Sequence, residues 1–375
     1  MNSKEKIEES VEYILQNKIK KCDLGIIVGT GLGGLVNSVN IIVEIQYSSI
    51  PHFPLSKMEM QNSRIIFGKI NSREILIFDG RFHKYEDLNY FQITYPVFIM
   101  SQLGVKKLVV TNAAGGIDLK LKKAILKNKI VFALTHNYSS YPMLREAKNI
   151  ISNQKLGKIN LINVEYPQGY TVGVKKKDEK ATLKWRLDKK QSGPSMILSE
   201  IGTHAYHLLR YVTGLEANEI SAEVNSLSSE ISVDDNAFVL LRMRNKARGI
   251  IWVSSAATGG ENGLKIRVYG TKGSIEWLQD DPNNLKFTEL DKPMKVITRA
   301  SKLVSKFSLS SSRIAAGHPE GFFEAFANIY SEFADQIHNK NKKYSFPTID
   351  DGVAGIKFIY AAKKSSNLNS KWIKI

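Results

Sequence analysis

Apolar residues follow two different periods along the first part of the chain. Near the amino terminus they recur at helical spacing among charged residues, at Ile7, Val11, Ile14, Leu15 and Ile19. Short apolar runs then cover residues 24–28, 41–47, 74–78 and 108–110, each too short for a helix. One amphipathic helix followed by buried strands predicts an α/β layer.

The remaining residues predict a different architecture. We expect strands at residues 129–134 and 157–165 and helices at residues 142–153 and 199–211. Period-two runs follow at residues 237–244, 249–255, 264–269 and 274–278, separated by polar turns. These runs are typical of an antiparallel sheet with one covered face. We expect the aromatic residues of a later helix to lie in the core, namely Phe322, Phe323, Phe326 and Tyr330.

Charge is distributed unevenly between the two stretches. Residues 1–117 hold 13 basic and 11 acidic side chains, whereas residues 118–375 hold 40 and 25, giving a net charge of +17. This step indicates a boundary near residue 118. Only 12 of the 53 basic residues are arginine, the better bidentate partner of phosphates and bases. We therefore favour a lysine-rich solvated surface and no nucleic-acid partner.

Composition also limits the compartment. The apolar runs are too short to span a bilayer, and Glu5, Glu8 and Glu9 lie where a secretion signal needs an apolar core. Cys22 is the single cysteine, which excludes an internal disulfide and a zinc finger. We expect a cytoplasmic protein without membrane contact, and we assign no metal ligands.

Three motifs of the first stretch carry candidate chemistry. Gly29–Gly34, GTGLGG, follows a strand and matches the dinucleotide fingerprint, although a tight turn without a ligand is an alternative. The nearest acidic residue for a ribose, Glu44, comes only ten residues after Gly34. Arg81 and His83 follow the strand at residues 74–78 and suit an oxyanion. Small residues at 111–116 end another strand, where α/β sheets bind ligands.

Together with IPHFP, GRFHKYE and LGVKKLVVTNAAGG, the glycine loop resembles the purine nucleoside phosphorylases, which are trimeric and phosphate-dependent. This resemblance implies inorganic phosphate as a co-substrate and a role for His83 in catalysis. It also implies a phosphate site of Thr30, Gly31, Arg81, His83 and Ala113, and a ribose site with Tyr85 and Asn112. Met60-Gln61 departs from the family's Gly-His, and the resemblance stops near Ile117 without the residues that hold the purine.

The second stretch carries a candidate proton acceptor. Glu200 and His204 stand at i and i+4 on a predicted helix, where a carboxylate can orient an imidazole as a base. The alternative is a partly buried histidine satisfied by its neighbours. VFALTHNYSSYP, EIGTHAYHLLRYVTG, VYGTKGSIEW, GHPEGFFEAFANIY and FPTIDDG resemble the Gfo/Idh/MocA oxidoreductases. The resemblance implies that His204 is catalytic and that Glu200 replaces the usual Asp. The family's dinucleotide loop and Glu-Lys-Pro segment, with its catalytic Lys, are not matched.

We therefore expect an α/β fold with a composite, partly parallel sheet, followed by an α+β domain with an open antiparallel sheet. The expected parts are a phosphorylase-like partial domain (1–117), a linker helix with a residual Rossmann-like segment (118–190) and a substrate or oligomerisation domain (191–375). Our main functional reading is a phosphorylase-like protein acting on purine nucleosides. The alternatives are an NAD(P)-dependent sugar or inositol oxidoreductase, with weak dinucleotide binding, and a fusion without turnover. A homo-oligomer is compatible with each.

Overall fold

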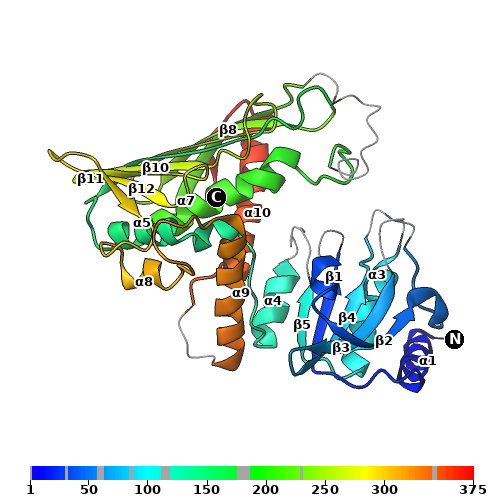
Figure 1. Cartoon of the computed structure of the whole chain (residues 1–375). Coiled ribbons are helices and arrows are strands. Elements are labelled where there is room, and N and C mark those ends of the chain that lie inside the picture. Colours follow the sequence, from blue (N-terminus) through cyan, green and yellow to red (C-terminus); the bar gives the residue numbers. More distant parts are fainter. Residues whose placement is uncertain are drawn as a thin grey trace. The chain divides into compact units, whose positions relative to one another are not determined.

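The computed structural model describes residues 2–29, 33–56, 63–83, 86, 88–110, 119–174, 186–228, 231–339 and 344–375. The chain divides into two compact units, residues 1–114 and residues 115–375 (Figure 1). No helix in these described ranges is long and apolar enough to cross a membrane.

In its described part, the first unit contains a five-stranded sheet with the order β2-β3-β4-β1-β5. The strands are β1 (Leu24–Val28), β2 (Asn40–Gln46), β3 (Arg64–Ile70), β4 (Arg73–Asp79) and β5 (Lys107–Val110). The central strand β1 pairs in parallel with β4 and β5, whereas β2, β3 and β4 form an antiparallel meander. The helices are α1 (Ser3–Gln16), α2 (Gly33–Val36) and α3 (Tyr90–Gln102).

Apolar packing explains why these elements form. Strands β3 and β4 bury consecutive residues on both faces, as expected for strands inside a covered sheet. Ile14 of α1 and Ile99 of α3 are fully buried in the same core as Leu76 of β4. Asparagines cap α1 and α3: the Asn2 side chain accepts from two backbone amides of the first turn of α1, and the Asn89 side chain accepts from one in α3. The helix at the amino terminus and the buried strands β1 and β4 are therefore as predicted, whereas β2 is largely exposed and β5 is only partly buried.

The second unit is built on a larger sheet, which has nine strands among the described residues, in the order β13-β12-β11-β10-β6-β9-β8-β7-β14. Its strands are β6 (Ile159–Pro167), β7 (Ala217–Asn225), β8 (Asn236–Met243), β9 (Arg248–Ser254), β10 (Lys265–Gly270), β11 (Gly273–Leu278), β12 (Asn284–Glu289), β13 (Lys295–Thr298) and β14 (Ile373–Lys374). All pairs are antiparallel except β6 with β9.

The helices of the second unit are α4 (Leu119–Lys127), α5 (Pro142–Ser152), α7 (Thr203–Thr213), α8 (Lys306–Leu309), α9 (Phe322–His338) and α10 (Ile349–Asn367), and three of them cover one face of the sheet. Helices α5, α7 and α10 pack against the strands, and Val164, Ile251 and Leu208 are fully buried between the layers. A π-helical turn, η4 (Leu198–Gly202), leads directly into α7, and a 3₁₀ turn, η3 (Asn137–Ser140), precedes α5. Figure 1 shows α5 and α7 beneath the sheet.

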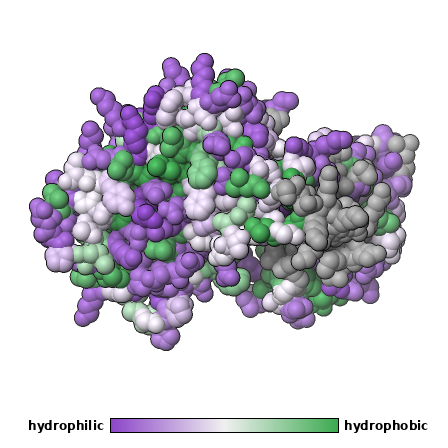
Figure 2. All heavy atoms as spheres, turned by 90° about the horizontal axis from the view of Figure 1, so that it is seen from above, coloured by the Kyte–Doolittle hydropathy of each residue, from purple (hydrophilic) through white to green (hydrophobic). Residues whose placement is uncertain are grey.

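The opposite face of the sheet is open. Side chains alternate along β8 and β9, so that Phe238, Leu240 and Ile250 are about half exposed while their neighbours are buried. Figure 2 looks onto this face and shows apolar residues interrupted by polar ones. The predicted α/β fold with a following open sheet is thus confirmed.

Three details of the prediction are corrected. Residues 130–136 form no strand, so the parallel sheet does not continue from β5 into this segment. Strand β6 was assigned to a residual Rossmann-like segment, but it lies in the middle of the larger sheet. Three of the four aromatic residues that were predicted to lie in the core are exposed, since Phe322 is 45 % exposed, Phe323 82 % and Tyr330 52 %, and Phe326 is only half-buried. Helical spacing alone does not reveal which face of a helix the core covers.

Candidate active site

Three imidazole rings meet at the beginning of α7. His204 and His207 lie on its first turns, and His136 directly precedes η3. Nδ1 of His136 is 3.1 Å from Nδ1 of His204, with the two rings perpendicular. The His136 ring also stacks on His207, with 4.8 Å between centroids and 16° between planes. We call these three residues the histidine cluster.

Hydrogen bonds fix the segment that carries His136. The Ser139 hydroxyl donates to the His136 carbonyl over 2.9 Å, and the Leu134 amide donates to the Pro347 carbonyl over 2.7 Å. Helix α7 is held in turn by its packing on α10, where Tyr206 stacks on Phe358 at 4.5 Å. The rings are therefore placed by rigid elements on both sides.

Burial lowers the pKa of every ring in the cluster. The pKa of His204 falls to about 4, because burial and the nearby His207 both disfavour its charged form. The pKa of His136 is also well below its usual range, by burial and then by the other two rings. Burial lowers the pKa of His207, although the nearby Asp351 carboxylate partly offsets this. All three rings are therefore neutral near neutral pH, as a proton acceptor must be.

Ion pairs between Arg210 and two carboxylates lie next to the histidine cluster. The Arg210 guanidinium donates to Asp351 over 2.9 Å and to Glu216 over 2.7 Å. Nδ1 of His207 lies 3.6 Å from the same Asp351 oxygen, beyond hydrogen-bond distance. Asp351 also accepts from the Thr348 amide at the first turn of α10. These bonds tie α7 to α10 and hold the backbone on which His204 and His207 stand.

Tyr138 borders His204, and Tyr166 on β6 contacts Tyr138 in turn. The edge of the Tyr138 ring contacts His204 at 5.5 Å between centroids, and the Tyr138 and Tyr166 hydroxyls are 2.5 Å apart. Burial raises the pKa of both tyrosines, so both remain protonated donors.

The structure does not bring Glu200 onto His204. Glu200 lies in the π-helical turn, where its carboxylate accepts from the Tyr170 hydroxyl over 3.1 Å. Its other oxygen is 2.8 Å from the Arg186 guanidinium. A cation and a phenol bind a carboxylate more strongly than a neutral imidazole does. The orienting hydrogen bond predicted from the i, i+4 spacing is thus absent from the described structure, and Glu200 belongs to a separate polar group with Tyr170 and Arg186.

The first unit places only part of the predicted phosphate site in the described residues. Nε of Arg81 is 3.4 Å from Nε2 of His83, and burial followed by the Arg81 charge lowers the pKa of His83. A Cβ added to Gly29 would lie 3.1 Å from the Arg81 guanidinium, so this cation adjoins the end of β1. The other predicted residues, Thr30, Gly31, Tyr85, Asn112 and Ala113, lie outside the described residues.

The sequence spacing suggested Glu44 as the acidic residue for a ribose, but the sheet topology favours Asp79. Glu44 is on β2, at the edge of the sheet, and pairs with Arg64 at 2.9 Å. Asp79 is the last residue of β4, in register with Val28 of the adjacent parallel strand β1. Its carboxylate also pairs with Arg64, at 3.2 Å. Sequence spacing missed Asp79 because the β2–β3 hairpin separates it from the glycine loop.

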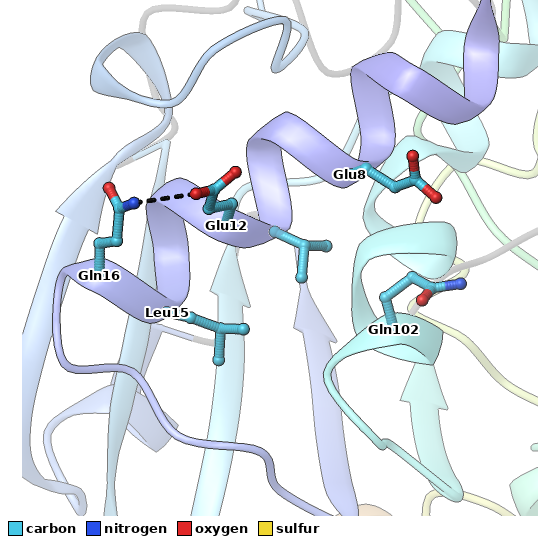
Figure 3. A pocket seen from close by; sticks show the side chains of 6 residues that line it. Glu8, Glu12, Leu15, Gln16 and Gln102 are labelled. Atoms are coloured by element: carbon cyan, nitrogen blue, oxygen red, sulfur yellow. Dashed lines mark hydrogen bonds between the residues drawn. The ribbon is translucent and has the colours of Figure 1, made fainter.

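A shallow groove on the first unit lies elsewhere. Helices α1 and α3 line it with Glu8, Val11, Glu12, Leu15, Gln16 and Gln102 (Figure 3). Glu12 accepts from Gln16 over 3.2 Å, and none of the predicted site residues lies in the lining. In the part of the chain that the structure describes, no three His, Cys, Asp or Glu residues group into a metal site.

The comparisons with known proteins identify the class to which this layered domain belongs. Residues 144–276 match the GFO/IDH/MocA C-terminal domain. An oxidoreductase of Bacillus subtilis is 30% identical over 278 residues, covering 72% of this chain and 70% of that protein. The chain belongs to the Gfo/Idh/MocA family of oxidoreductases.

Solved structures show the same similarity. An oxidoreductase from Sinorhizobium meliloti is 38% identical, with a TM-score of 0.63, covering 76% of this chain and 77% of that chain. An inositol dehydrogenase homolog from Azotobacter vinelandii, complexed with NAD+, is 29% identical, with a TM-score of 0.63 and coverage of 68% of both chains. Its complex with NADH and myo-inositol aligns with 96% of this chain and 100% of that chain, at 22% identity and a TM-score of 0.69, which shows the shared fold.

The phosphorylase reading of the chain is corrected by these findings. Purine nucleoside phosphorylase 1 of Geobacillus stearothermophilus is 36% identical over 112 residues, only 30% of this chain and 41% of that enzyme. The chain thus spans about two fifths of the length of that phosphorylase. The oxidoreductase similarity covers most of the chain, so the phosphorylase activity that we placed first is wrong as the function of the whole chain.

Proposed function

We propose that the chain is an NAD(P)-dependent oxidoreductase of a polyhydroxylated substrate, such as a sugar or an inositol, in which His204 accepts the proton of the hydroxyl being oxidised. The observation that carries this proposal is the neutral His204 ring, whose Nδ1 faces His136. Its Nε2 has no hydrogen-bond partner in the described residues and is not among the buried unpartnered atoms. That nitrogen is the one available to a substrate.

Polar groups near His204 suit a substrate rich in hydroxyls. Glu200 lies one helical turn before His204 and is about one quarter exposed, with Arg186 and Tyr170 on its two oxygens. A carboxylate, a guanidinium and a phenol together accept and donate hydrogen bonds, which is how a pocket recognises an array of hydroxyls. In this proposal Glu200 binds substrate rather than orienting His204.

The end of β1 fits a dinucleotide in the kinds of residue that it offers. β1 lies between two parallel strands, and ligands of open α/β sheets bind at the carboxyl end of such strands. Gly29 would allow the pyrophosphate close to the backbone, Arg81 would pair with its charge, and Asp79 would accept from a ribose hydroxyl. A bound nicotinamide would supply the hydride acceptor that side chains lack. The Gfo/Idh/MocA oxidoreductases carry a catalytic lysine in a Glu-Lys-Pro segment, and residues 111–118 after β5 contain no lysine. We therefore assign the role of the base to His204.

The test has two parts. NAD+ and NADP+ are titrated into the full chain by intrinsic fluorescence, and sugars and inositols are then screened for formation of reduced nicotinamide. We expect one dinucleotide to bind with a Kd below about 1 mM, and at least one polyol to be oxidised. Arg81→Ala should weaken dinucleotide binding, whereas Arg73→Ala, at the opposite end of β4, should not.

Phosphorolysis provides the contrasting measurement. Inosine with phosphate should release no hypoxanthine, since the similarity covers only 41% of that phosphorylase. Absence of dinucleotide binding at millimolar concentration would overturn the proposed function, as would turnover of no polyol.

A further inference from the structure

A residue other than Glu200 must orient the His204 ring. Glu200 is engaged by Tyr170 and Arg186. Within the described residues, the hydrogen bond of the His204 ring is to Nδ1 of His136, at 3.1 Å. His136 comes from a segment 68 residues earlier in the chain, so no local spacing links the two rings.

Proton counting leaves two arrangements for this bond. A neutral imidazole has one N–H and one lone pair, so a single proton lies between the two Nδ1 atoms. If His136 donates, His204 carries its own proton on Nε2 and cannot accept another there. If His204 donates, its Nε2 has the lone pair and is free to take a proton from a substrate.

We propose that His136 accepts the Nδ1–H of His204 and is thereby the positioning residue that presents the Nε2 lone pair of His204 to the substrate. This inference rests on the proposed function, because that function requires a base at His204. Nε2 of His204 would take the proton of the substrate hydroxyl, and a bound oxidised nicotinamide would accept the hydride from the same carbon. The resulting positive charge on His204 is then shared with the His136 lone pair.

The surroundings of His136 favour a fixed ring. His136 stacks on His207 and is perpendicular to His204, so turning the ring would break one contact or the other. The charged groups behind His207 are Asp351, Arg210 and the half-buried Lys148, which lies over the Tyr211 ring at 4.1 Å. Hydrogen bonds in such a poorly solvated site are stronger than those in water.

Nitrogen NMR tests the arrangement directly. In the full chain labelled with 15N-histidine, the His204 signals are identified by their loss in His204→Asn. We expect the Nδ1–H form of His204 in the wild type. The Nε2–H form would overturn the inference. This readout needs no turnover, so it decides the role of His136 even if the proposed function fails.

Two substitutions of His136 separate positioning from packing. In His136→Asn, the side-chain oxygen can take the place of Nδ1 as an acceptor, whereas His136→Phe keeps a ring without an acceptor. We expect His136→Phe to shift His204 toward the Nε2–H form and to lower kcat by about 10- to 100-fold with little change in KM. His136→Asn should restore most of both properties, and the exposed His318→Phe should change neither. Equal kcat values in the Phe and Asn variants would contradict the inference.

Discussion

Three neutral imidazoles share one small region beneath the sheet, and each would be protonated more readily in the unfolded chain. Burial holds the pKa of His204 at about 4 and lowers those of His136 and His207 as well. The ordinary value is about 6.5. The cluster therefore links the stability of the second unit to pH.

The sign of this linkage follows from proton binding. Between about 4 and about 6.5 the unfolded chain binds more protons at these rings than the folded chain does. Their contribution to stability is complete above about pH 6.5 and is lost as the pH falls toward the folded pKa values. We expect the urea midpoint to fall between about pH 7.5 and about pH 5, and to fall less in His207→Phe. A midpoint that stays constant over this range would contradict the neutral cluster.

The site residues show what sequence could and could not provide. His204 was chosen as the candidate base from EIGTHAYH, and its role stays a prediction. His136 was visible in VFALTHNYSSYP only as part of a motif, since its partner lies 68 residues away. Tyr170 and Arg186 gave no signal, because the bonds that draw Glu200 away from His204 form only after folding.

At the scale of elements, Arg299 holds the long segment between β13 and α9 by hydrogen bonds and an ion pair. Arg299 is 2% exposed and pairs with the buried Glu320 at 3.0 Å. It also donates to the carbonyls of Ile314, Ala315 and His318 over 2.6–2.9 Å. This arginine therefore closes the segment between β13 and α9, which carries α8.

Removing that charge should be costly. Arg299→Met leaves Glu320 buried without its cation, so we expect the free energy of unfolding to fall by about 3–5 kcal/mol. Arg248→Met is the matched control, because Arg248 is exposed and donates to the neighbouring Lys246 and Ala247 carbonyls. It should change stability by about 0.5 kcal/mol or less. Urea unfolding that shows equal losses in the two variants would contradict this role of Arg299.

Strands and helices with strong periodicity were predictable. The bounds of β1 were predicted to the residue, and β8 to β11 follow the period-two pattern because one face of the sheet is buried and the other is open. Residues 129–134 were not predictable in the same way. An apolar run forms a strand only when a neighbouring strand pairs with its backbone, and the sequence of the run does not show whether such a neighbour exists.

At the scale of the whole molecule, two similarities meet in one chain. A glycine loop at the end of a parallel strand suits inorganic phosphate and a dinucleotide pyrophosphate for the same physical reason, which is its backbone amides. The sequence of the loop therefore could not distinguish a phosphorylase from a dinucleotide-dependent oxidoreductase. The extent of the similarity decided between them, since the oxidoreductase match covers 72% of the chain and the phosphorylase match 30%.

The central claim is that His204 is the proton acceptor of a dinucleotide-dependent oxidation, and one comparison tests it most directly. The rate of nicotinamide reduction and the Kd of the dinucleotide are measured side by side for wild type, His204→Asn and the exposed control His318→Asn. We predict that His204→Asn lowers kcat by about 10²- to 10⁴-fold while the Kd of the dinucleotide and the kcat of the control stay unchanged. A His204→Asn variant whose kcat equals that of the wild type would contradict the claim.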